Sequence, residues 1–396
     1  MRITLVLFIF AVRLSAQSWV QLPDFPGTER DDGVSFVISN KAYCLSGLDV
    51  GFNCRADGFV FDGASESWLP MAPLPVGNER QYAVAFAHGN AGYVLGGINC
   101  SNTCLNDFWK YDPVGNSWTA LANFPGIARQ GMCYFKIRSK IYVAGGKLAD
   151  GSILNDVWEY DVNAANWTQK NNLPVNGLWR GAGFALDTTG YICYGMNATG
   201  GYNRLMYAYD HTSDSWALVP GLTFSGRRYI AVAVSGNSAY LYGGQDSLGN
   251  IYNDLQVFDG FDHSVHTRSG IPTFARKGCM AFMLNTTFYV TTGVTNTARV
   301  KETWKATGVV GINSIGPEEE LLAYPNPVQN LLHIRGLDSE KDVALVEIYN
   351  AMGVPVRSLP FSETLDVSVL PQGFYVALIR GSAQVYKIRF VKNGYG

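Results

Sequence analysis

A repeat of 49 or 50 residues limits what this chain of 396 residues can fold into more than any other feature. A tryptophan position recurs at this spacing, at Trp19, Trp68, Trp118, Trp167 and Trp216. A glycine position recurs in the same phase, at Gly47, Gly97, Gly146, Gly195, Gly244 and Gly293. Repeats of this length arise when one supersecondary unit stacks on copies of itself and buries a shared core. The sequence therefore predicts six units over residues 17–307.

Each unit contains four short stretches rich in β-branched and aromatic residues, separated by polar or glycine-containing turns. In the third unit they read GMCYFKI, IYVAGG, DVWEYD and NWTQK. Such a pattern is typical of β-strands, and a four-stranded sheet repeated at this spacing is typical of a propeller blade. We therefore predict an all-β fold in which residues 17–307 form a six-bladed β-propeller.

The composition agrees with a large sheet protein and excludes other classes. Charged residues are 16% of the chain, against roughly a quarter in an average soluble domain. The net charge of −2 lacks the basic excess of nucleic-acid-binding proteins, and the apolar and aromatic content is too high for a disordered chain. We expect no nucleic acid among the partners.

The two ends of the repeat array predict how the ring closes. The sixth unit stops after VKETWKA, so its fourth strand is missing. An unpaired strand, residues 18–22, precedes the first unit and has the sequence of an outer strand. We expect residues 17–22 to supply the outer strand of the sixth blade, because exposed sheet edges invite aggregation.

The repeat also resembles a known family. An Arg precedes the first strand, Gly-Gly ends the second, an aromatic-Asp pair such as Tyr111-Asp112 ends the third, and Trp opens the fourth. This pattern resembles the Kelch repeat, and the resemblance implies a Kelch β-propeller. Units one, four and six depart from it, because Ser46, Tyr194 and Thr292 replace the first glycine.

The segments outside the repeat predict export of the protein and a second domain. Residues 1–16 combine Arg2, an apolar run and a small-residue end, as a cleaved signal peptide does. After residue 16 we expect no transmembrane segment. Residues 308–320 lack apolar periodicity and are predicted to be a linker. Residues 321–396 break the repeat and show alternating strands, so we predict a small Ig-like antiparallel β-sandwich.

Four motifs in this tail resemble the C-terminal sorting domain of the type IX secretion system. Their residues are Tyr324, Pro325, Asn326 and Pro327; Gly353; Leu370, Pro371, Gly373 and Tyr375; and Lys387 and Lys392 in the closing strand. The resemblance implies that the secretion machinery is a partner of residues 321–396. It also implies that the protein is secreted or held at the cell surface. An ordinary Ig-like binding module is the alternative.

A ladder of arginines is the first candidate for a ligand site, formed by Arg30, Arg80, Arg129, Arg180, Arg228 and Arg276. First strands line a propeller's channel, so we expect these residues to surround one mouth, where guanidinium groups suit carboxylates, phosphates or acidic glycans. Trp179 and Tyr229 extend this rim. Trp179 is either an exposed sugar-stacking residue or a plug between blades.

The structural alternative is that these arginines pair with aspartates. Asp57, Asp107, Asp156 and Asp254 recur ten residues after the ladder glycines, and pairing between blades would satisfy both sets. Units four and six have Leu205 and Thr303 at this position. We therefore expect Arg180 and Arg276 to be unpaired.

Catalytic readings have less support. With 5 His, and no convergent pair among them, the copper site of radical oxidases of this repeat type is not expected, and we expect no metal or cofactor. The sequence is also similar to six-bladed Kelch sialic-acid epimerases, which implies Glu79 and Arg80 as alternative catalytic residues, with Glu29 as a further acid or base. We expect instead a non-catalytic module that binds a glycan or a protein; a structural surface protein is a third reading.

Seven cysteines leave at least one unpaired in an exported chain. Cys100 and Cys104 lie in one loop, which makes a local bridge plausible. Cys54 has the same repeat position as Cys104, and its alternatives are Cys44 or the neighbouring blade. Cys133, Cys193 and Cys279 lie in first or second strands and are expected to be buried thiols.

Overall fold

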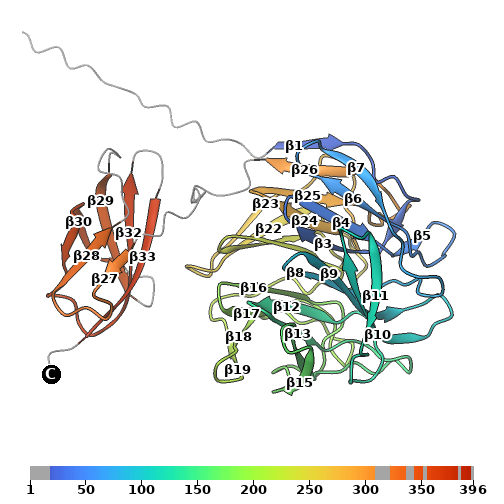
Figure 1. Cartoon of the computed structure of the whole chain (residues 1–396), viewed down its shortest axis with the longest axis horizontal. Helices are drawn as coiled ribbons and strands as arrows, with labels where there is room; N and C mark the ends of the chain where they lie inside the picture. The colour runs from blue at the N-terminus through green and yellow to red at the C-terminus, as the bar shows by residue number, and fades with distance from the viewer. Residues whose placement is uncertain (1–17, 308–321, 336–342, 351–354, 382–384, 394–396) are drawn as a thin grey trace, which may run out of the picture. The chain divides into compact units, whose positions relative to one another are not determined.

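The computed structural model describes residues 18–307, 322–335, 343–350, 355–381 and 385–393. The chain forms two compact units, Met1–Val309 and Val310–Gly396, and all regular elements in the described residues are strands (Figure 1). Within these ranges, no helix is long and apolar enough to cross a membrane. The predicted signal peptide (1–16) and linker (308–320) lie outside the described residues.

Residues 18–307 form six four-stranded antiparallel sheets, five of them built from one repeat each and the sixth from the last repeat together with the N-terminal strand. From the inner to the outer strand, the sheets are β3 (Val34–Ile38), β4 (Lys41–Leu45), β6 (Gly58–Asp62) and β7 (Ser67–Met71); β8 (Val84–His88), β9 (Ala91–Ile98), β10 (Cys104–Asp112) and β11 (Ser117–Leu121); β12 (Cys133–Ile137), β13 (Lys140–Ala144), β14 (Val157–Asp161) and β15 (Asn166–Lys170); β16 (Ala182–Leu186), β17 (Thr189–Cys193), β18 (Tyr207–Asp210) and β19 (Ser215–Leu218); β20 (Ala231–Ser235), β21 (Ser238–Tyr242), β22 (Asp254–Asp259) and β23 (Val265–Ser269); and β24 (Met280–Leu284), β25 (Thr287–Thr291), β26 (Thr303–Thr307) and β1 (Ser18–Leu22). A short extra pair joins β2 (Arg30–Asp31) to β5 (Leu48–Asp49).

The last of these sheets contains both ends of the array. Strand β1 pairs antiparallel with β26, with Trp19 opposite Ala306. The Trp19 indole N–H donates to the Ser269 carbonyl of the preceding sheet at 3.0 Å. The predicted closure by the N-terminal strand is therefore confirmed, and it covers the edge of β26 that would otherwise be unpaired.

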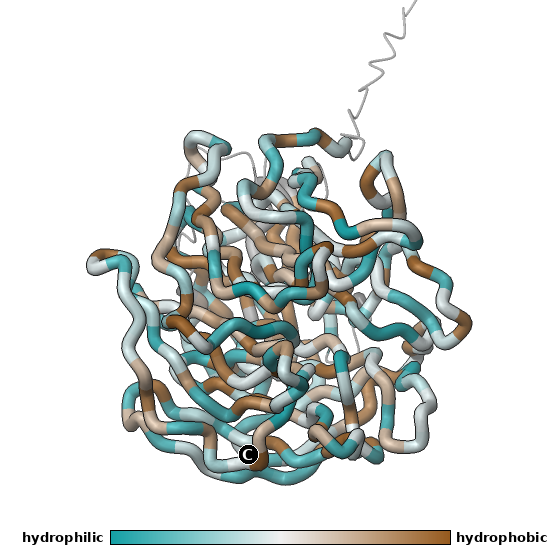
Figure 2. The backbone as a smooth tube through the Cα atoms, turned by 90° about the vertical axis from the view of Figure 1, so that its right-hand side faces the viewer, coloured by the Kyte–Doolittle hydropathy of each residue, from teal (hydrophilic) through white to brown (hydrophobic). Residues whose placement is uncertain are grey.

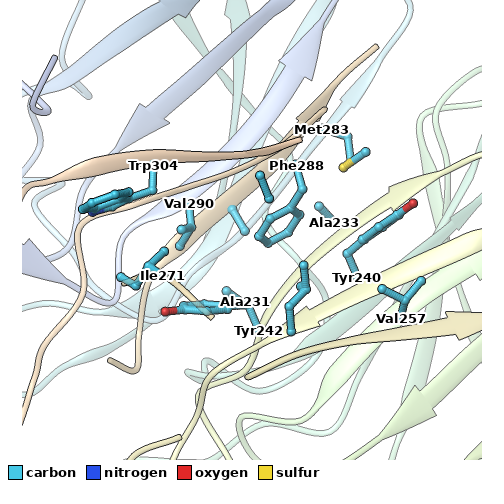
Figure 3. Packing of buried hydrophobic residues seen from close by; sticks show 13 residues of the cluster. Ala231, Ala233, Tyr240, Tyr242, Val257, Ile271, Met283, Phe288, Val290 and Trp304 are labelled. Atoms are coloured by element: carbon cyan, nitrogen blue, oxygen red, sulfur yellow. The ribbon is translucent and has the colours of Figure 1, made fainter. Parts of the chain in front are cut away.

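The core of this unit lies between neighbouring sheets. Figure 3 shows one such layer, where residues of β20–β22 face residues of β24–β26. Tyr240 and Phe288 stack there with ring centroids 5.9 Å apart. Along the backbone, hydrophobic and hydrophilic residues alternate rather than forming long uniform segments (Figure 2). Short apolar runs interrupted by polar residues are expected where buried strands end in solvated turns.

The second unit also consists of antiparallel strands. One sheet joins β27 (Leu322–Tyr324), β28 (Leu331–Arg335) and β31 (Thr364–Asp366); the other joins β30 (Pro355–Pro360), β29 (Val343–Asn350), β32 (Gly373–Gly381) and β33 (Val385–Lys392). The two sheets share one buried cluster that includes Leu332, Val346 and Phe390. Its Ig-like topology stays a prediction.

The sorting motifs occupy turns and strand ends of this unit. The Asn326 side chain accepts the Val391 N–H at 2.9 Å, and the Tyr375 hydroxyl donates to the Pro371 carbonyl at 2.8 Å. The first bond ties the Tyr324–Pro327 turn to strand β33, and the second closes the Leu370–Tyr375 segment on itself. Lys387 and Lys392 lie on β33, while Gly353 lies outside the described residues.

Candidate functional site

Six residues at one repeat position close a ring of backbone hydrogen bonds. They lie directly before the inner strands and are Asp32, Tyr82, Gly131, Arg180, Tyr229 and Gly278. Each N–H donates to the carbonyl of the previous member at 2.8 to 3.3 Å, and Asp32 donates to Gly278 at 2.8 Å. All six have φ between 56° and 65°. Because successive inner strands follow this ring, it marks one mouth of the central channel.

The Arg180 side chain crosses this ring. Its guanidinium lies between the rings of Tyr82 and Tyr229, 3.9 and 4.0 Å from their centroids. Its Nη2 donates to Asp32 Oδ1 of the first repeat, three ring positions away. Burial acts to lower the pKa of Arg180, but Asp32 and the two tyrosines outweigh it and raise that pKa. Arg180 is therefore a charged plug fixed at the mouth of the channel.

Two glycines of the ring make room for this plug. A Cβ at Gly131 would lie 2.5 Å from Trp179 Nε1. A Cβ at Gly278 would lie 2.6 Å from the Asp32 carboxylate oxygen. A side chain at Gly131 would press on Trp179 and on Arg180 itself, and one at Gly278 would press on the Asp32 that binds Arg180. The positive φ of both positions favours glycine independently.

Two adjacent carboxylates lie at the mouth, and both are buried. Asp32 binds Arg180, while Asp31 accepts from Arg299 Nε at 2.6 Å. Burial and the neighbouring Asp32 raise the pKa of Asp31 to about 7, although Arg299 acts to lower it. Asp31 therefore holds its proton more tightly than an exposed carboxyl group does.

A second set of residues forms a cationic rim, which we define as Lys147, Arg228 and Lys277. Lys147 Nζ lies 4.7 Å from the ring of Trp179, and Arg228 Cζ lies 5.2 Å from the same ring. Arg228 Cζ and Lys277 Nζ lie 4.9 and 4.8 Å from the ring of Tyr229. Aromatic faces attract cations, so Trp179 and Tyr229 position all three charges.

The cationic rim makes no ion pair with a carboxylate within the described residues. Lys277 Nζ donates to the neutral side chain of Gln245 at 2.6 Å. Arg228 Nε and Trp179 Nε1 are buried and have no hydrogen-bond partner in the described part of the chain. Buried donors usually have partners. The three rim cations are therefore hydrogen-bond donors without a bound carboxylate in the described part of the chain.

The repeat explains how these residues come together. The residue before each ring member bridges to the residue after the ladder glycine, as Gln130 does to Lys147 and Lys277 to Val294. Trp179 and Arg228 hold the same position as Gln130 and Lys277 and bridge to Met196 and Gln245. Two repeat positions thus supply the whole rim. The sequence contained this signal in the residues next to the arginine and glycine ladders.

The expected ring of six ladder arginines needs correction. Four are at most 1% exposed, namely Arg30, Arg80, Arg129 and Arg276. They bind Asp57, Asp107, Asp156 and Glu302 respectively, each in the same repeat rather than in a neighbouring blade. Arg276 is therefore paired, because Glu302 replaces the aspartate one residue earlier.

The fourth and fifth repeats shift the ladder. In the fifth, Arg227 and not Arg228 occupies the buried position and binds Asp254. In the fourth, Leu178 takes the arginine's place and Leu205 the aspartate's. Arg180 lies two residues later and is bound to Asp32, so the expectation that it is unpaired is also corrected.

Trp179 is 6% exposed. Its ring lies among Lys147, Arg228, Tyr82 and Tyr229. The expectation of an exposed sugar-stacking ring is therefore corrected in favour of the buried alternative. Trp179 supports the cations instead of offering a face to a ligand.

The alternative catalytic pair is also engaged elsewhere. Arg80 is fully buried, and its Nε, Nη1 and Nη2 all donate to Asn78, Gly96 or Asp107. The Glu79 carboxylate accepts from the Gly77 N–H at 3.3 Å, and Glu29 pairs with Lys301 at 3.2 Å. Neither glutamate lines the cavity bounded by the ring.

One disulfide joins the first two sheets, through the segments that connect their second and third strands. It links Cys54 to Cys100, which confirms the neighbouring-blade alternative for Cys54 and corrects the local Cys100–Cys104 bridge. Cys44, Cys104, Cys133, Cys193 and Cys279 are thiols, and all but Cys279 are buried. Among the described residues, no group of three or more His, Cys, Asp or Glu side chains is placed to hold a metal ion.

Comparison with known proteins gives three family matches. The KLHDC2/KLHL20/DRC7 Kelch-repeats domain matches residues 122–293, the Kelch motif matches residues 79–125, and the secretion system C-terminal sorting domain matches residues 322–393. A solved structure titled "Structure of YjhT" has a TM-score of 0.60 at 18% identity, covering 71% of this chain and 95% of that one. At this identity the likeness concerns the fold. None of the curated proteins matches the chain significantly.

Proposed function

We propose that this chain, a Kelch-repeat β-propeller protein with a C-terminal sorting domain of the type IX secretion system, binds an anionic ligand through its cationic rim without catalysis. The sorting domain indicates export by type IX secretion to the cell surface or the extracellular space. The ligand is therefore an extracellular glycan or protein that presents carboxylates.

The observation that carries the proposal is the unneutralised charge of Lys147, Arg228 and Lys277. All three are half-buried, lie against aromatic rings, and have no carboxylate partner within the described residues. Partly buried cations are costly unless they are paired, and charge-assisted bonds to carboxylates are among the strong ones. Side chains already held in place lose less entropy on binding.

A non-catalytic role is favoured over the epimerase reading because the two residues implied for catalysis are occupied. Every nitrogen of the Arg80 guanidinium already donates to a protein acceptor, which leaves none for a substrate. Proton transfer needs a group within hydrogen-bond reach of the substrate, and Glu79 does not line the cavity at the mouth. A catalytic role for this pair therefore lacks geometric support.

The test uses matched acidic and neutral probes with the full chain. Oligogalacturonate and its methyl ester form one pair, and a hexaglutamate peptide and hexaglutamine form the other. We expect binding of one acidic probe and at least tenfold weaker binding of its neutral partner. Arg228→Met and Lys277→Met should each weaken binding several-fold, while Arg138→Met, at an exposed hairpin, should not.

Three outcomes are informative. Loss of binding in the rim variants alone supports the proposal and identifies the glycan or the peptide as the better ligand. Equal binding of the variants and the unsubstituted chain overturns the site. If neither acidic probe binds the unsubstituted chain, the proposal is overturned in favour of a structural surface protein.

A further inference from the structure

A small cavity lies at the ring that closes the channel mouth. Its volume is about 140 Å³, and it is lined by Asp32, Tyr82, Arg180 and Tyr229 of the ring together with residues directly before the inner strands, such as Met132 and Ile230. The rim residues Lys147, Arg228 and Lys277 are not part of this lining. The cavity is therefore distinct from the cationic rim.

Arg180 lines this cavity and has an unused donor. Its side chain is 9% exposed, and its Nη2 donates to Asp32. Its Nη1 is buried and has no hydrogen-bond partner within the described residues. An unsatisfied buried donor is costly, and a charged one more so. A hydrogen-bond acceptor at Nη1 would remove this cost.

The stacking of Arg180 restricts where such an acceptor can lie. Tyr82 and Tyr229 cover the two faces of the guanidinium at 3.9 and 4.0 Å, and Asp32 occupies Nη2. An acceptor must therefore approach in the guanidinium plane, at the Nη1 edge. This geometry suits one small acceptor group. It excludes a ligand that would stack on a face of the guanidinium, because both faces are covered.

The charges around the cavity favour an anion over a neutral acceptor. Asp32 compensates Arg180, and Asp31 is paired with Arg299. Lys277 lies close enough for both aspartates and Arg180 to act on its pKa, and Arg228 acts on it as well. These two rim cations leave an excess of positive charge beside the cavity, which attracts an anion even without contact.

We propose that the cavity binds one small monovalent anion, a halide or a one-carbon carboxylate, at Arg180 Nη1. Asp32 is the neighbouring group that opposes this binding by like-charge repulsion. The anion completes the hydrogen bonding of the plug, and its binding does not require the ligand of the cationic rim.

Bromide is the probe, because it can be located by anomalous scattering in crystals of the full chain. We expect a peak within hydrogen-bond reach of Arg180 Nη1. In solution, replacing sodium gluconate with sodium bromide at constant ionic strength should raise the melting temperature. Asp32→Asn should bind bromide several-fold more tightly, because the repulsion is removed while the shape is kept.

The double variant Asp32→Asn/Arg180→Met isolates the arginine without leaving a buried unpaired carboxylate. It should lose the crystallographic peak and the bromide-specific stabilisation that Asp32→Asn alone shows, while Arg138→Met should keep both. Absence of a peak at Arg180 in the unsubstituted chain, or equal bromide stabilisation of the single and double variants, would overturn the proposal. Neither result depends on whether oligogalacturonate or hexaglutamate binds the rim.

Discussion

Arg180 and Asp32 are 148 residues apart in the sequence and bind each other across the mouth of the channel. Because Asp32 belongs to the first repeat and Arg180 to the fourth, the bond spans the ring of repeats rather than joining neighbours. The ring of backbone hydrogen bonds passes through both residues. The plug is therefore built into the closure of the propeller.

Removing only Arg180 should be more harmful than removing both partners. Arg180→Met leaves Asp32 buried without its cation, a change that typically costs about 3–5 kcal/mol. Asp32→Asn/Arg180→Met leaves no such charge and should cost markedly less. Urea unfolding of the single and double variants measures this coupling. Strictly additive losses would show that the two side chains are not energetically linked.

Gly131 should tolerate a methyl group less well than a glycine with space around it. Gly131→Ala places its Cβ against Trp179 at 2.5 Å, at φ 64°. Gly151 has φ 93° and nothing within 4 Å of a Cβ, so Gly151→Ala suffers only backbone strain, about 1–2 kcal/mol. We expect Gly131→Ala to cost roughly 1–3 kcal/mol more than this control. Equal melting temperatures for the two variants would contradict the tight packing at the ring.

Each buried Arg–Asp pair of the ladder should be replaceable only as a pair. The fourth repeat has two leucines at these positions, so two apolar residues can take the place of the ion pair. Arg30→Leu leaves the Asp57 carboxylate without its main partner and should destabilise by about 3–5 kcal/mol. Arg30→Leu/Asp57→Leu copies Leu178 and Leu205 and should recover most of that loss. Chemical unfolding compares the two variants. A double variant no more stable than the single one would rule out an apolar replacement in this repeat.

The carboxylate pair predicts a pH dependence of stability. Because burial and Asp32 raise the pKa of Asp31 to about 7, the folded chain holds this proton more tightly than the unfolded chain. The free energy of unfolding should therefore fall as pH rises from about 4 to 7, by up to about 1.4 kcal/mol per pH unit. Burial lowers the pKa of His88, and this acts in the opposite direction near its ordinary pKa.

Asp31→Asn isolates the effect of Asp31, since it keeps the side chain's size and leaves His88 unchanged. Relative to the unsubstituted chain, it should gain stability between pH 5 and pH 7.5. Melting curves across this range measure the difference. A difference that stays constant with pH would mean that Asp31 does not titrate in this range.

The sequence predicted the parts of the fold that depend on spacing. The tryptophan and glycine ladders count the repeats, and the missing outer strand of the sixth repeat pointed to residues 18–22. Strand β1 pairs with β26 as expected, because an unpaired edge can be filled only by a segment of strand-forming sequence.

The candidate site was less predictable, because a repeat of 49 or 50 residues leaves the alignment uncertain by one or two positions. Arg228 and Arg180 resemble ladder arginines by spacing alone, yet hydrogen bonding assigns that position to Arg227 and Leu178. Where a strand meets a turn, a shift of one or two residues moves a side chain from a buried ion pair to the mouth of the channel. Lys147 and Lys277 were missed because their partners are aromatic rings on other repeats.

The disulfide was also beyond local reasoning. Cys100 and Cys104 are close in sequence, but the partner of Cys100 is Cys54, 46 residues earlier. Side-by-side stacking of equivalent loops brings such residues together, and only the packing of the first two sheets specifies which pair meets.

The most direct test of the cationic rim is a calorimetric titration of oligogalacturonate into the full chain and into Arg228→Met/Lys277→Met, at low and at high salt. We predict that the unsubstituted chain binds at low salt, that the double variant binds at least tenfold more weakly, and that high salt removes most of the difference, because half-exposed charges are screened. Hexaglutamate serves as the second probe under the same conditions. Equal affinity of both chains for whichever probe binds, at both salt concentrations, would contradict the assignment of the rim as the ligand site.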